Sequence, residues 1–354
     1  MEWYRRSSAE LKASNYKKGM AFFTGIWNPR AVKAVRQKIK VFRPDIVHIQ
    51  NLYPLISPAI LATIKEAEVP IVMRCPNYRL FCPNGLHLDN RGNVCEKCLS
   101  TGREIHCVLK NCENNRMKSF GYAVRNYTAR KWWGILRYVD TYIVQTDFQK
   151  QKFISNGIPE NRISIVPGLT PEIPKYEKSE LGDLVTFVGR VSLSKGIIEF
   201  IEAAQQLPHI QFAIAGSVDP SLQYLQNKTP KNIHWKGFVK GAELNHLYHN
   251  SRIIVIPGKW YEGFPNVITR AMKHGKPVIT SNLGAMASII DHQHNGLLVK
   301  PGNTGELKQA IEQLYNSPQQ CIEYGTNGYH KAMENYASEQ IYNKLVTTYK
   351  TLKE

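Results

Sequence analysis

The sequence lacks an apolar run of the roughly 18 residues that a membrane-spanning helix requires. Its first twenty residues, "MEWYRRSSAELKASNYKKGM", are basic but are not followed by an apolar stretch, so they do not resemble a secretory signal. Hydrophobic residues make up 43% of the 354 residues and the mean hydropathy is −0.35, as in globular proteins. We therefore expect a cytoplasmic protein of about two domains.

Acidic residues are scarce. The chain has 28 Asp and Glu against 46 Lys and Arg, a formal net charge of +18. Such an excess favours polyanionic partners, which include nucleotide phosphates, anionic lipids and nucleic acids. The sequence contains no recognised nucleic-acid-binding motif, so we do not expect nucleic acid as a partner.

Two common phosphate-binding motifs are also absent. The chain contains neither the G-x-x-x-x-G-K-[ST] loop nor the G-x-G-x-x-G fingerprint. This argues against a P-loop nucleotidase and against a dinucleotide-binding enzyme.

Cysteines are few and unevenly placed: six of the seven lie between residues 75 and 112, and Cys321 is isolated. In a cytoplasmic chain such crowding favours metal binding or redox chemistry over disulfides. Cys95 and Cys98 form a C-x2-C knuckle, which lets two thiolates reach one ion. We predict a structural zinc ion with four of these cysteines as ligands and Cys107 as the alternate: Cys82, Cys95, Cys98 and Cys112.

Two other interpretations of the cysteine-rich segment stay open. The thiols can pack as small apolar groups, or one pair can form a disulfide. His87 and His106 are expected to be solvated loop residues. We expect no catalytic metal.

Short β-branched runs alternate with amphipathic helical segments, a rhythm typical of parallel sheets with crossover helices. The first half contains four predicted strands, at residues 45–49, 70–74, 141–146 and 162–168. The second half contains six, at residues 184–190, 210–217, 232–238, 252–258, 276–281 and 296–300. The sequence therefore predicts an α/β protein with two doubly wound, Rossmann-like domains that face each other across a cleft.

The expected domain boundaries follow from the same pattern. We expect an N-terminal domain over residues 1–169, with a cysteine-rich insertion at about 75–112, and a polar linker at 170–183. A second domain follows over 184–336, and the last helix, 337–354, is expected to pack back toward the first domain. Almost no strand signal precedes residue 45, so we expect the N-terminal domain to be incomplete and to lack its first βαβ piece.

Two predicted strand-to-helix loops in the second domain carry charges of opposite sign. The first places Gly189, Arg190, Lys195 and Gly196 after a strand, and cations beside free helical amides suit a diphosphate. The second, "PGKWYEGFPNVITRAM", places Glu262 at a comparable turn. Taken alone, the cations could be merely solvated and Glu262 could stabilise a helix dipole. Taken together, cations for phosphates and a carboxylate for sugar hydroxyls indicate a nucleotide-sugar site.

The motifs "GRVSLSKG", "YEGFPNV-x3-AM-x2-GKPVI-x-S" and "NGLLV-x-PGN" resemble the donor half of retaining glycosyltransferases of family 4, which have the GT-B fold. The first-half segments "FRPDIVHIQNLYPLISPAIL" and "NYRLFCPNGL" also resemble that family, so the similarity runs from about residue 28 to the end. It implies transfer of a sugar from a nucleoside-diphosphate sugar, a UDP- or GDP-sugar, to an acceptor hydroxyl with retention of anomeric configuration.

The resemblance also implies roles for particular residues. Arg190 and Lys195 would neutralise the diphosphate leaving group, and Glu262 would hold the donor sugar or assist at the reacting face, so these three are the candidate catalytic residues. The candidate donor-binding residues are Gly189, Arg190, Lys195, Glu262, Gly263, Phe264, Asn266, Val267 and Arg270.

Two positions depart from the family pattern. The family usually has a second glutamate eight residues after the first, which accepts hydrogen bonds from the ribose, whereas this chain has Arg270, which cannot accept one. We expect Arg270 to lie two helical turns after Glu262 on roughly the same helix face. From there Arg270 could donate to a ribose oxygen, pair with Glu262 or reach a phosphate. Pro76 replaces a histidine found in many members. The alternative function is therefore a catalytically impaired relative that binds a nucleotide sugar or serves as a partner subunit.

The segment "RMKSFGYAVRNYTARKWWGILRY", residues 116–138, contains no acidic residue and has two adjacent tryptophans. A basic helix with tryptophans suits the surface of an anionic membrane. Peripheral attachment to the inner face of the membrane would go with a lipid-linked acceptor, while a polysaccharide or other glycan acceptor needs no such contact. The alternative is a helix that packs its aromatic face on the sheet of the first domain.

Overall fold

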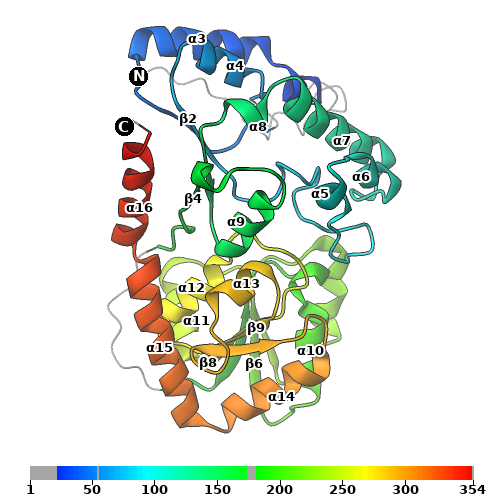
Figure 1. Cartoon of the computed structure of the whole chain (residues 1–354). Helices are drawn as coiled ribbons and strands as arrows, with labels where there is room; N and C mark the ends of the chain where they lie inside the picture. Colours follow the sequence, from blue (N-terminus) through cyan, green and yellow to red (C-terminus); the bar gives the residue numbers. More distant parts are fainter. Residues whose placement is uncertain (1–21, 54–55, 172, 174–180, 353–354) are drawn as a thin grey trace. The chain divides into compact units, whose positions relative to one another are not determined.

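The computed structural model describes residues 22–53, 56–171, 173 and 181–352 (Figure 1). The chain divides into two compact units. Unit 1 comprises Met1–Arg91, Cys95–Val166 and Lys344–Glu354, and unit 2 comprises Gly92–Val94 and Pro167–Asn343. Within the described ranges, none of the helices combines the length and the apolar character needed to cross a membrane.

Unit 1 is built on a four-stranded parallel sheet in which neighbours in the chain are neighbours in space, in the order β1-β2-β3-β4. The strands are β1 (Val47–Ile49), β2 (Ile71–Arg74), β3 (Thr141–Val144) and β4 (Ile163–Ile165). All four lie where the sequence predicts them. From residue 22 to the start of β1 the described residues form helices and loops rather than a strand. Residues 1–21 lie outside the described residues, so the missing first βαβ piece stays a prediction.

The helices that accompany this sheet include α3 (Pro29–Phe42), α4 (Ile60–Glu66), α5 (Lys97–Thr101), α6 (Ile105–Leu109), α7 (Arg116–Lys131), α8 (Ile135–Tyr138) and α9 (Asp147–Ile154). Two of them begin at asparagine caps. The side chain of Asn28 accepts from the Ala31 amide at 3.1 Å, and that of Asn115 accepts from the Lys118 amide at 3.0 Å. An asparagine oxygen satisfies one of the free amides of the first turn, so both helix starts are set by local sequence.

Unit 2 is built on a six-stranded parallel sheet with the order β10-β9-β8-β5-β6-β7. The strands are β5 (Leu184–Val188), β6 (Gln211–Ala215), β7 (Ile233–Gly237), β8 (Ser251–Ile256), β9 (Val278–Ser281) and β10 (Gly296–Val299). The helices of this half of the chain are α10 (Ile197–Gln205), α11 (Gly241–Asn250), α12 (Asn266–Lys273), α13 (Gly284–Ile289), α14 (Thr304–Tyr315), α15 (Pro318–Tyr336) and α16 (Ser338–Lys350), the last of which ends in unit 1.

Both faces of the unit 2 sheet are buried. Along β6, Phe212 and Ile214 belong to one hydrophobic cluster and Ala213 and Ala215 to the other. Successive side chains of a strand point to opposite faces, so alternating membership means that helices cover each side. This is why the strands of unit 2 read as continuous apolar runs, and the predicted doubly wound arrangement is confirmed.

The strand order of unit 2 reverses between β5 and β8, which pair directly although sixty residues separate them. From β5 the chain runs outward through β6 and β7, and it then returns to add β8, β9 and β10 on the other side. In open parallel sheets the loops that leave the strands diverge at such a switch point and leave space for a ligand. The switch point of unit 2 lies at the carboxyl ends of β5 and β8.

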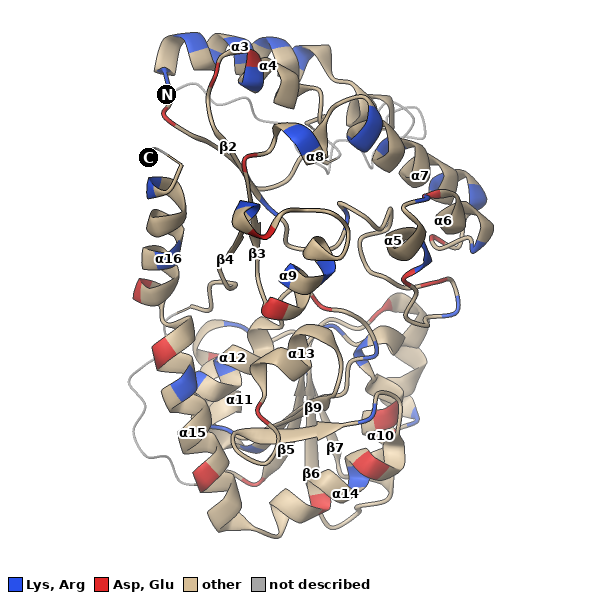
Figure 2. Cartoon of the chain, in the orientation of Figure 1, with Lys and Arg blue, Asp and Glu red and all other residues tan. Residues whose placement is uncertain are grey.

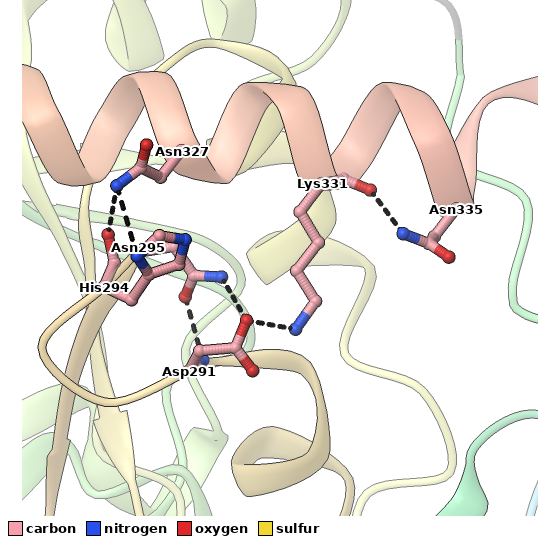
Figure 3. A network of polar contacts seen from close by, with 6 residues as sticks. All are labelled: Asp291, His294, Asn295, Asn327, Lys331 and Asn335. Atoms are coloured by element: carbon pink, nitrogen blue, oxygen red, sulfur yellow. Dashed lines mark hydrogen bonds and ion pairs between the residues drawn. The ribbon is translucent and has the colours of Figure 1, made fainter.

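A polar network attaches α15 to the turn before β10 (Figure 3). Asn295 is fully buried; its side chain accepts from the Asp291 amide at 3.0 Å and donates to the Asp291 carboxylate at 3.2 Å. Lys331 of α15 reaches the same carboxylate at 2.7 Å, and Asn327 donates to the carbonyl of His294 at 2.9 Å. The turn is thus held both by itself and by the helix.

We expect the two parts of this network to contribute unequally to stability. Asn295→Ala removes two buried hydrogen bonds and should lower the free energy of unfolding by about 1–2 kcal/mol. Lys331→Met removes a partly exposed ion pair and should cost less than about 1 kcal/mol. Urea unfolding of the two variants tests this order, and a larger loss for Lys331→Met would contradict it.

Candidate functional site

The loop after β5 carries the first predicted cluster of site residues. Gly189 follows the strand with φ 144°, and Arg190 beside it is exposed. A short 3-10 turn, Leu193–Lys195, then leads through Gly196 into α10. The backbone amides at the start of α10 and the Lys195 ammonium therefore lie at the carboxyl edge of the sheet.

The loop after β8 touches this first loop through its backbone. The amide of Lys259 donates to the carbonyl of Ser194 at 2.8 Å. Gly196 has φ 74°, and a Cβ at this position would lie 1.9 Å from the carbonyl oxygen of Pro257. Only glycine fits so close an approach, so this residue keeps the two loops together at the switch point.

This contact brings Lys195 and Glu262 together. The Lys195 Nζ lies 2.5 Å from the Glu262 Oε1, and the lysine also lies over the ring of Trp260, 5.4 Å from its centroid. The side chains are 18% and 9% exposed, respectively. An ion pair this well shielded holds both side chains in fixed positions.

A second ion pair beside it was not anticipated from the sequence. Lys259 Nζ lies 2.6 Å from Glu199 Oε1, which joins the loop after β8 to the first turn of α10. Lys259 sits three residues before Glu262 in the quoted "PGKWYEGF" stretch, so its place in the motif was the available signal.

Glycines end three neighbouring strands at this edge. Gly189, Gly216 and Gly237 follow or end β5, β6 and β7 with positive φ values of 144°, 152° and 65°. The Gly216 position is crowded, because a Cβ there would lie 1.8 Å from the carbonyl oxygen of Gly189. Gly189 was predicted from the sequence, whereas Gly216 and Gly237 were not. Because glycine has no side chain, the backbone is uncovered at these three positions, and this edge of the sheet allows a close approach.

Glu262 and Arg270 do not share a helix face, contrary to expectation. Helix α12 begins at Asn266, after Pro265, so Glu262 lies in the preceding loop. The structure pairs Glu262 with Lys195, while Arg270 donates to the Asn245 side chain of α11 at 2.8 Å. The carboxylate and the cation eight residues later thus contact different elements.

Arg270 belongs to a stack of side chains between α11 and α12. Its guanidinium lies 5.7 Å from the ring centroid of Tyr248, and His274 stacks on that ring at 5.1 Å with an interplanar angle of 1°. Burial, together with the positive charge of Arg270, lowers the pKa of His274 to about 4, so this imidazole is neutral at neutral pH. Among the described residues, the Nε of Arg270 is buried and has no hydrogen-bond partner.

The other predicted donor-binding residues divide between surface and core. Asn266 is exposed, and Gly263 is half-buried. Phe264 and Val267 pack against the second hydrophobic cluster of unit 2, and Phe264 makes an edge contact with Tyr336 at 5.7 Å. Their side chains therefore contribute to packing.

The cysteines of unit 1 are free thiols. Cys82, Cys98 and Cys107 are buried, and Cys95 and Cys112 are half-buried. Across the described ranges, no group of three or more His, Cys, Asp or Glu side chains is arranged to hold a metal ion. The structure therefore does not support the prediction of zinc on Cys82, Cys95, Cys98 and Cys112.

The local contacts account for this correction. The Cys82 thiol donates to the Asn84 side chain at 2.9 Å. Burial raises the pKa of Cys82 to about 11 and that of Cys98 to about 12. His87 was also misjudged: it is buried against Tyr78 and its Nδ1 lies 3.1 Å from the Cys95 carbonyl oxygen.

Comparisons with known proteins agree with this geometry. Residues 170–331 match the family described as glycosyl transferases group 1. An uncharacterized glycosyltransferase of Methanocaldococcus jannaschii is 30% identical over 220 residues, which are 59% of this chain and 56% of that protein. An N,N'-diacetylbacillosaminyl-diphospho-undecaprenol alpha-1,3-N-acetylgalactosaminyltransferase of Campylobacter jejuni is 25% identical over 203 residues, 52% of this chain and 53% of that protein. The chain thus spans about half the length of these relatives.

Among solved structures, HepE of Anabaena in complex with UDP superposes with a TM-score of 0.66 at 16% identity, covering 91% of this chain and 82% of that one. The fold is GT-B. In this GT-B chain, the half that matches the family contains the switch point of unit 2 and the Lys195–Glu262 pair.

The contact at Gly196 can be tested against a matched glycine. Gly241 also has a positive φ, 56°, but nothing lies within 4 Å of its Cβ position. We expect Gly241→Ala to cost about 1 kcal/mol of unfolding free energy, from the left-handed conformation alone. Gly196→Ala should cost at least about twice as much, because the methyl group would also collide with the Pro257 carbonyl.

The measurement is urea unfolding of both variants, monitored by tryptophan fluorescence. Equal losses would show that the two loops separate easily and that Gly196 does not hold them together.

Proposed function

We propose that the protein is a glycosyltransferase that transfers a sugar from a UDP- or GDP-sugar to a hydroxyl of a glycan or lipid-linked acceptor, with retention of anomeric configuration. The observation that carries the proposal is the Lys195–Glu262 pair at the switch point of unit 2. A cation and a carboxylate held there suit the two halves of a nucleotide sugar, its diphosphate and its hydroxyl groups. The group 1 family match over the same residues supports this assignment.

The positive groups act on the leaving group. Arg190 is exposed on the loop and free to turn toward a diphosphate, while Lys195 is held next to it by Glu262 and Trp260. As the bond between the anomeric carbon and the diphosphate oxygen breaks, negative charge grows on the departing diphosphate. Preplaced cations stabilise that charge more in the transition state than in the ground state.

Glu262 acts on the donor sugar. It is 8% exposed, and its carboxylate can accept hydrogen bonds from sugar hydroxyls once the diphosphate competes for Lys195. The new bond to the acceptor oxygen forms on the face that the diphosphate leaves, and the acceptor's proton departs with the diphosphate. We place Glu262, Arg190 and Lys195 in the catalytic roles on this basis.

The remaining donor contacts come from the surrounding turns. Gly189 and Gly263 let the backbone approach the ligand, and the turn at Phe264, Asn266 and Val267 offers backbone groups to it. Arg270, with its buried Nε unpaired among the described residues, is placed to donate to a ribose oxygen.

The alternative is a protein that binds the nucleotide sugar without transferring the sugar. Both functions require a donor site, so nucleotide binding alone does not separate them. Turnover does, and the experiment below therefore measures both quantities.

We expect Lys195→Met to lower UDP affinity at least tenfold and to lower the rate of sugar release from the donor by about 100-fold or more, because it removes a cation from the diphosphate. Lys231 is an exposed lysine just before β7, so Lys231→Met is the matched control and should change neither the UDP affinity nor the rate. Calorimetry with UDP and GDP, combined with an assay for released nucleoside diphosphate, provides the two measurements.

The outcomes separate the candidates. Binding that depends on Lys195, without turnover by the wild type over a panel of acceptors, would favour the binding protein. Nucleotide binding that is unchanged in Lys195→Met would show that the donor site does not lie at the switch point.

We further propose that unit 1 docks on an anionic membrane through α6 and α7. The positions Met117, Phe120, Val124, Tyr127 and Lys131 recur at intervals of three and four along α7 and so share one face. Met117 is 80% exposed, Phe120 52% and Tyr127 47%. The aromatic side chains thus point outward, and the opposite, buried face of α7 consists of smaller and polar residues such as Ser119 and Ala123.

A cavity of about 580 Å3 lies next to these side chains. Ile105 and Val108 of α6 line it together with Phe120 and Tyr127, and Arg103 and Lys131 stand at its edge. Figure 2 shows cations along α7. Arg125 is buried, and Lys118 and Arg130 pair with Glu113 and Glu104. The cations that remain for an anionic surface include Arg103 and Lys131, each of which can contribute about 1 kcal/mol there. Apolar side chains rimmed by cations match an anionic bilayer, and such a location would give access to a lipid-linked acceptor.

We expect Phe120→Ser combined with Tyr127→Ser to lower partitioning into phosphatidylglycerol-containing vesicles at least tenfold, because two apolar side chains no longer enter the bilayer. Tyr224→Ser, a 51% exposed tyrosine of unit 2, is the control and should leave partitioning unchanged. Vesicle sedimentation measures both variants. Equal partitioning of the wild type and the double variant would reject this face as the contact.

A further inference from the structure

Unit 1 contains a pocket at the carboxyl ends of β1 and β2 that the donor site does not use. Its volume is about 50 Å3, enough for several water molecules or one oxyanion group. The lining includes the residues that directly follow β1, Gln50 and Asn51, and two arginines, Arg74 at the end of β2 and Arg79 shortly after it. Carboxyl ends of parallel strands are where ligands of such sheets bind.

The arginines of this pocket are not neutralised. In the part of unit 1 that the structure describes, neither Arg74 nor Arg79 forms an ion pair with a carboxylate. The Nε of Arg79 is buried without a hydrogen-bond partner among the described residues. A guanidinium carries five donors, and leaving them buried and unused costs free energy unless a ligand accepts them.

A third arginine lies behind the pocket wall. Arg125 of α7 is 7% exposed, and its guanidinium stacks on the ring of Tyr53, a lining residue, at 4.3 Å from the centroid. Burial lowers the pKa of Arg125, and the charge of Arg79 lowers it further, which places these two cations close to each other. The charge of Glu113 also acts on Arg125, but Glu113 is itself paired with Lys118 at 2.5 Å. The arginines therefore keep a positive field that attracts an anion.

The pocket also offers neutral hydrogen-bond donors. The side chains of Gln50 and Asn51 are exposed at its mouth, and Asn77 lines it with a half-buried side chain. Arginine forks match the oxygen geometry of a phosphate, and amide groups can complete its shell. The chemistry gathered here is that of an oxyanion site.

We propose that this pocket binds a phosphate or diphosphate group of the acceptor, with Arg74 and Arg79 as its ligands. The inference rests on the proposed function, since it assigns a chemical class to the acceptor of that reaction. A sugar phosphate in solution and a lipid-linked sugar diphosphate share this group, and the lipid form would combine with membrane docking.

The test uses the full chain with inorganic pyrophosphate as the probe. Two backgrounds keep pyrophosphate away from the donor loops: the Lys195→Met variant, which weakens diphosphate binding there, and the wild type saturated with UDP. Arg74→Gln or Arg79→Gln, each added singly to either background, should weaken the affinity for pyrophosphate at least tenfold in calorimetric titrations. Arg30→Gln removes the same charge from an exposed position of α3 and should change the affinity less than twofold.

The same titrations with farnesyl diphosphate in detergent micelles distinguish the two sources. If Arg74→Gln weakens both probes equally, the diphosphate group alone is recognised; if it weakens only the farnesyl form, a lipid-linked group is the ligand. If neither arginine variant weakens either probe more than Arg30→Gln does, the inference is wrong.

UDP affinity, measured separately on Arg74→Gln, keeps the two proposals distinct. Intact UDP binding with unchanged pyrophosphate binding would overturn only the acceptor site. Arginine-dependent pyrophosphate binding in a chain that does not bind UDP would uphold the anion pocket and overturn the donor site. A melting temperature within a few degrees of wild type shows that each variant is folded.

Discussion

The backbone contact between Gly196 and Pro257 determines the geometry of the candidate donor site. Strands β5 and β8 pair directly, but pairing alone places only the ends of two loops side by side. The closeness of Gly196 to the Pro257 carbonyl brings the loops themselves into contact, and the hydrogen bond from Lys259 to Ser194 secures it. Lys195 and Glu262 can meet at 2.5 Å because their backbones are already held.

The two units handle positive charge differently. At the switch point of unit 2, Lys195 and Lys259 each have a carboxylate partner within 2.6 Å. At the strand ends of unit 1, Arg74 and Arg79 have none among the described residues. A paired cation can exchange its carboxylate for a phosphate with little net change in local charge, whereas an unpaired cation gains a counterion. The net charge of +18 is a sum over the whole chain and does not show that cations without a carboxylate partner gather at particular places such as these strand ends.

The sequence predicts the sheets better than it predicts the side-chain contacts. All ten strands were found, because β-branched runs between helical segments reflect burial on both faces of a parallel sheet, and the α/β fold class is confirmed. The loops with Lys195 and Glu262 were also identified. The Lys259–Glu199 pair was missed, because its partners are sixty residues apart and only the strand order brings them together.

The errors have local physical causes. Glu262 and Arg270 were assigned to one helix face on their spacing, but the helix starts only at Asn266, following Pro265. Spacing also suggested zinc at the cysteines, yet no group of three or more His, Cys, Asp or Glu side chains within the described ranges is arranged to hold a metal ion, and the Cys82 thiol donates to Asn84. Spacing predicts a contact only where the backbone is regular, and both segments are loops or short turns.

Arg270 shows how a departure from a family pattern can be supported by its surroundings. A bare exchange of carboxylate for guanidinium would leave a cation beside neighbours selected for an anion. Here Asn245 accepts a hydrogen bond from it, Tyr248 offers its ring, and His274 behind that ring is neutral because burial and Arg270 itself lower its pKa to about 4. The site thus accommodates a cation at this position. Such accommodation is what our proposal of a donor site with altered ribose contacts requires.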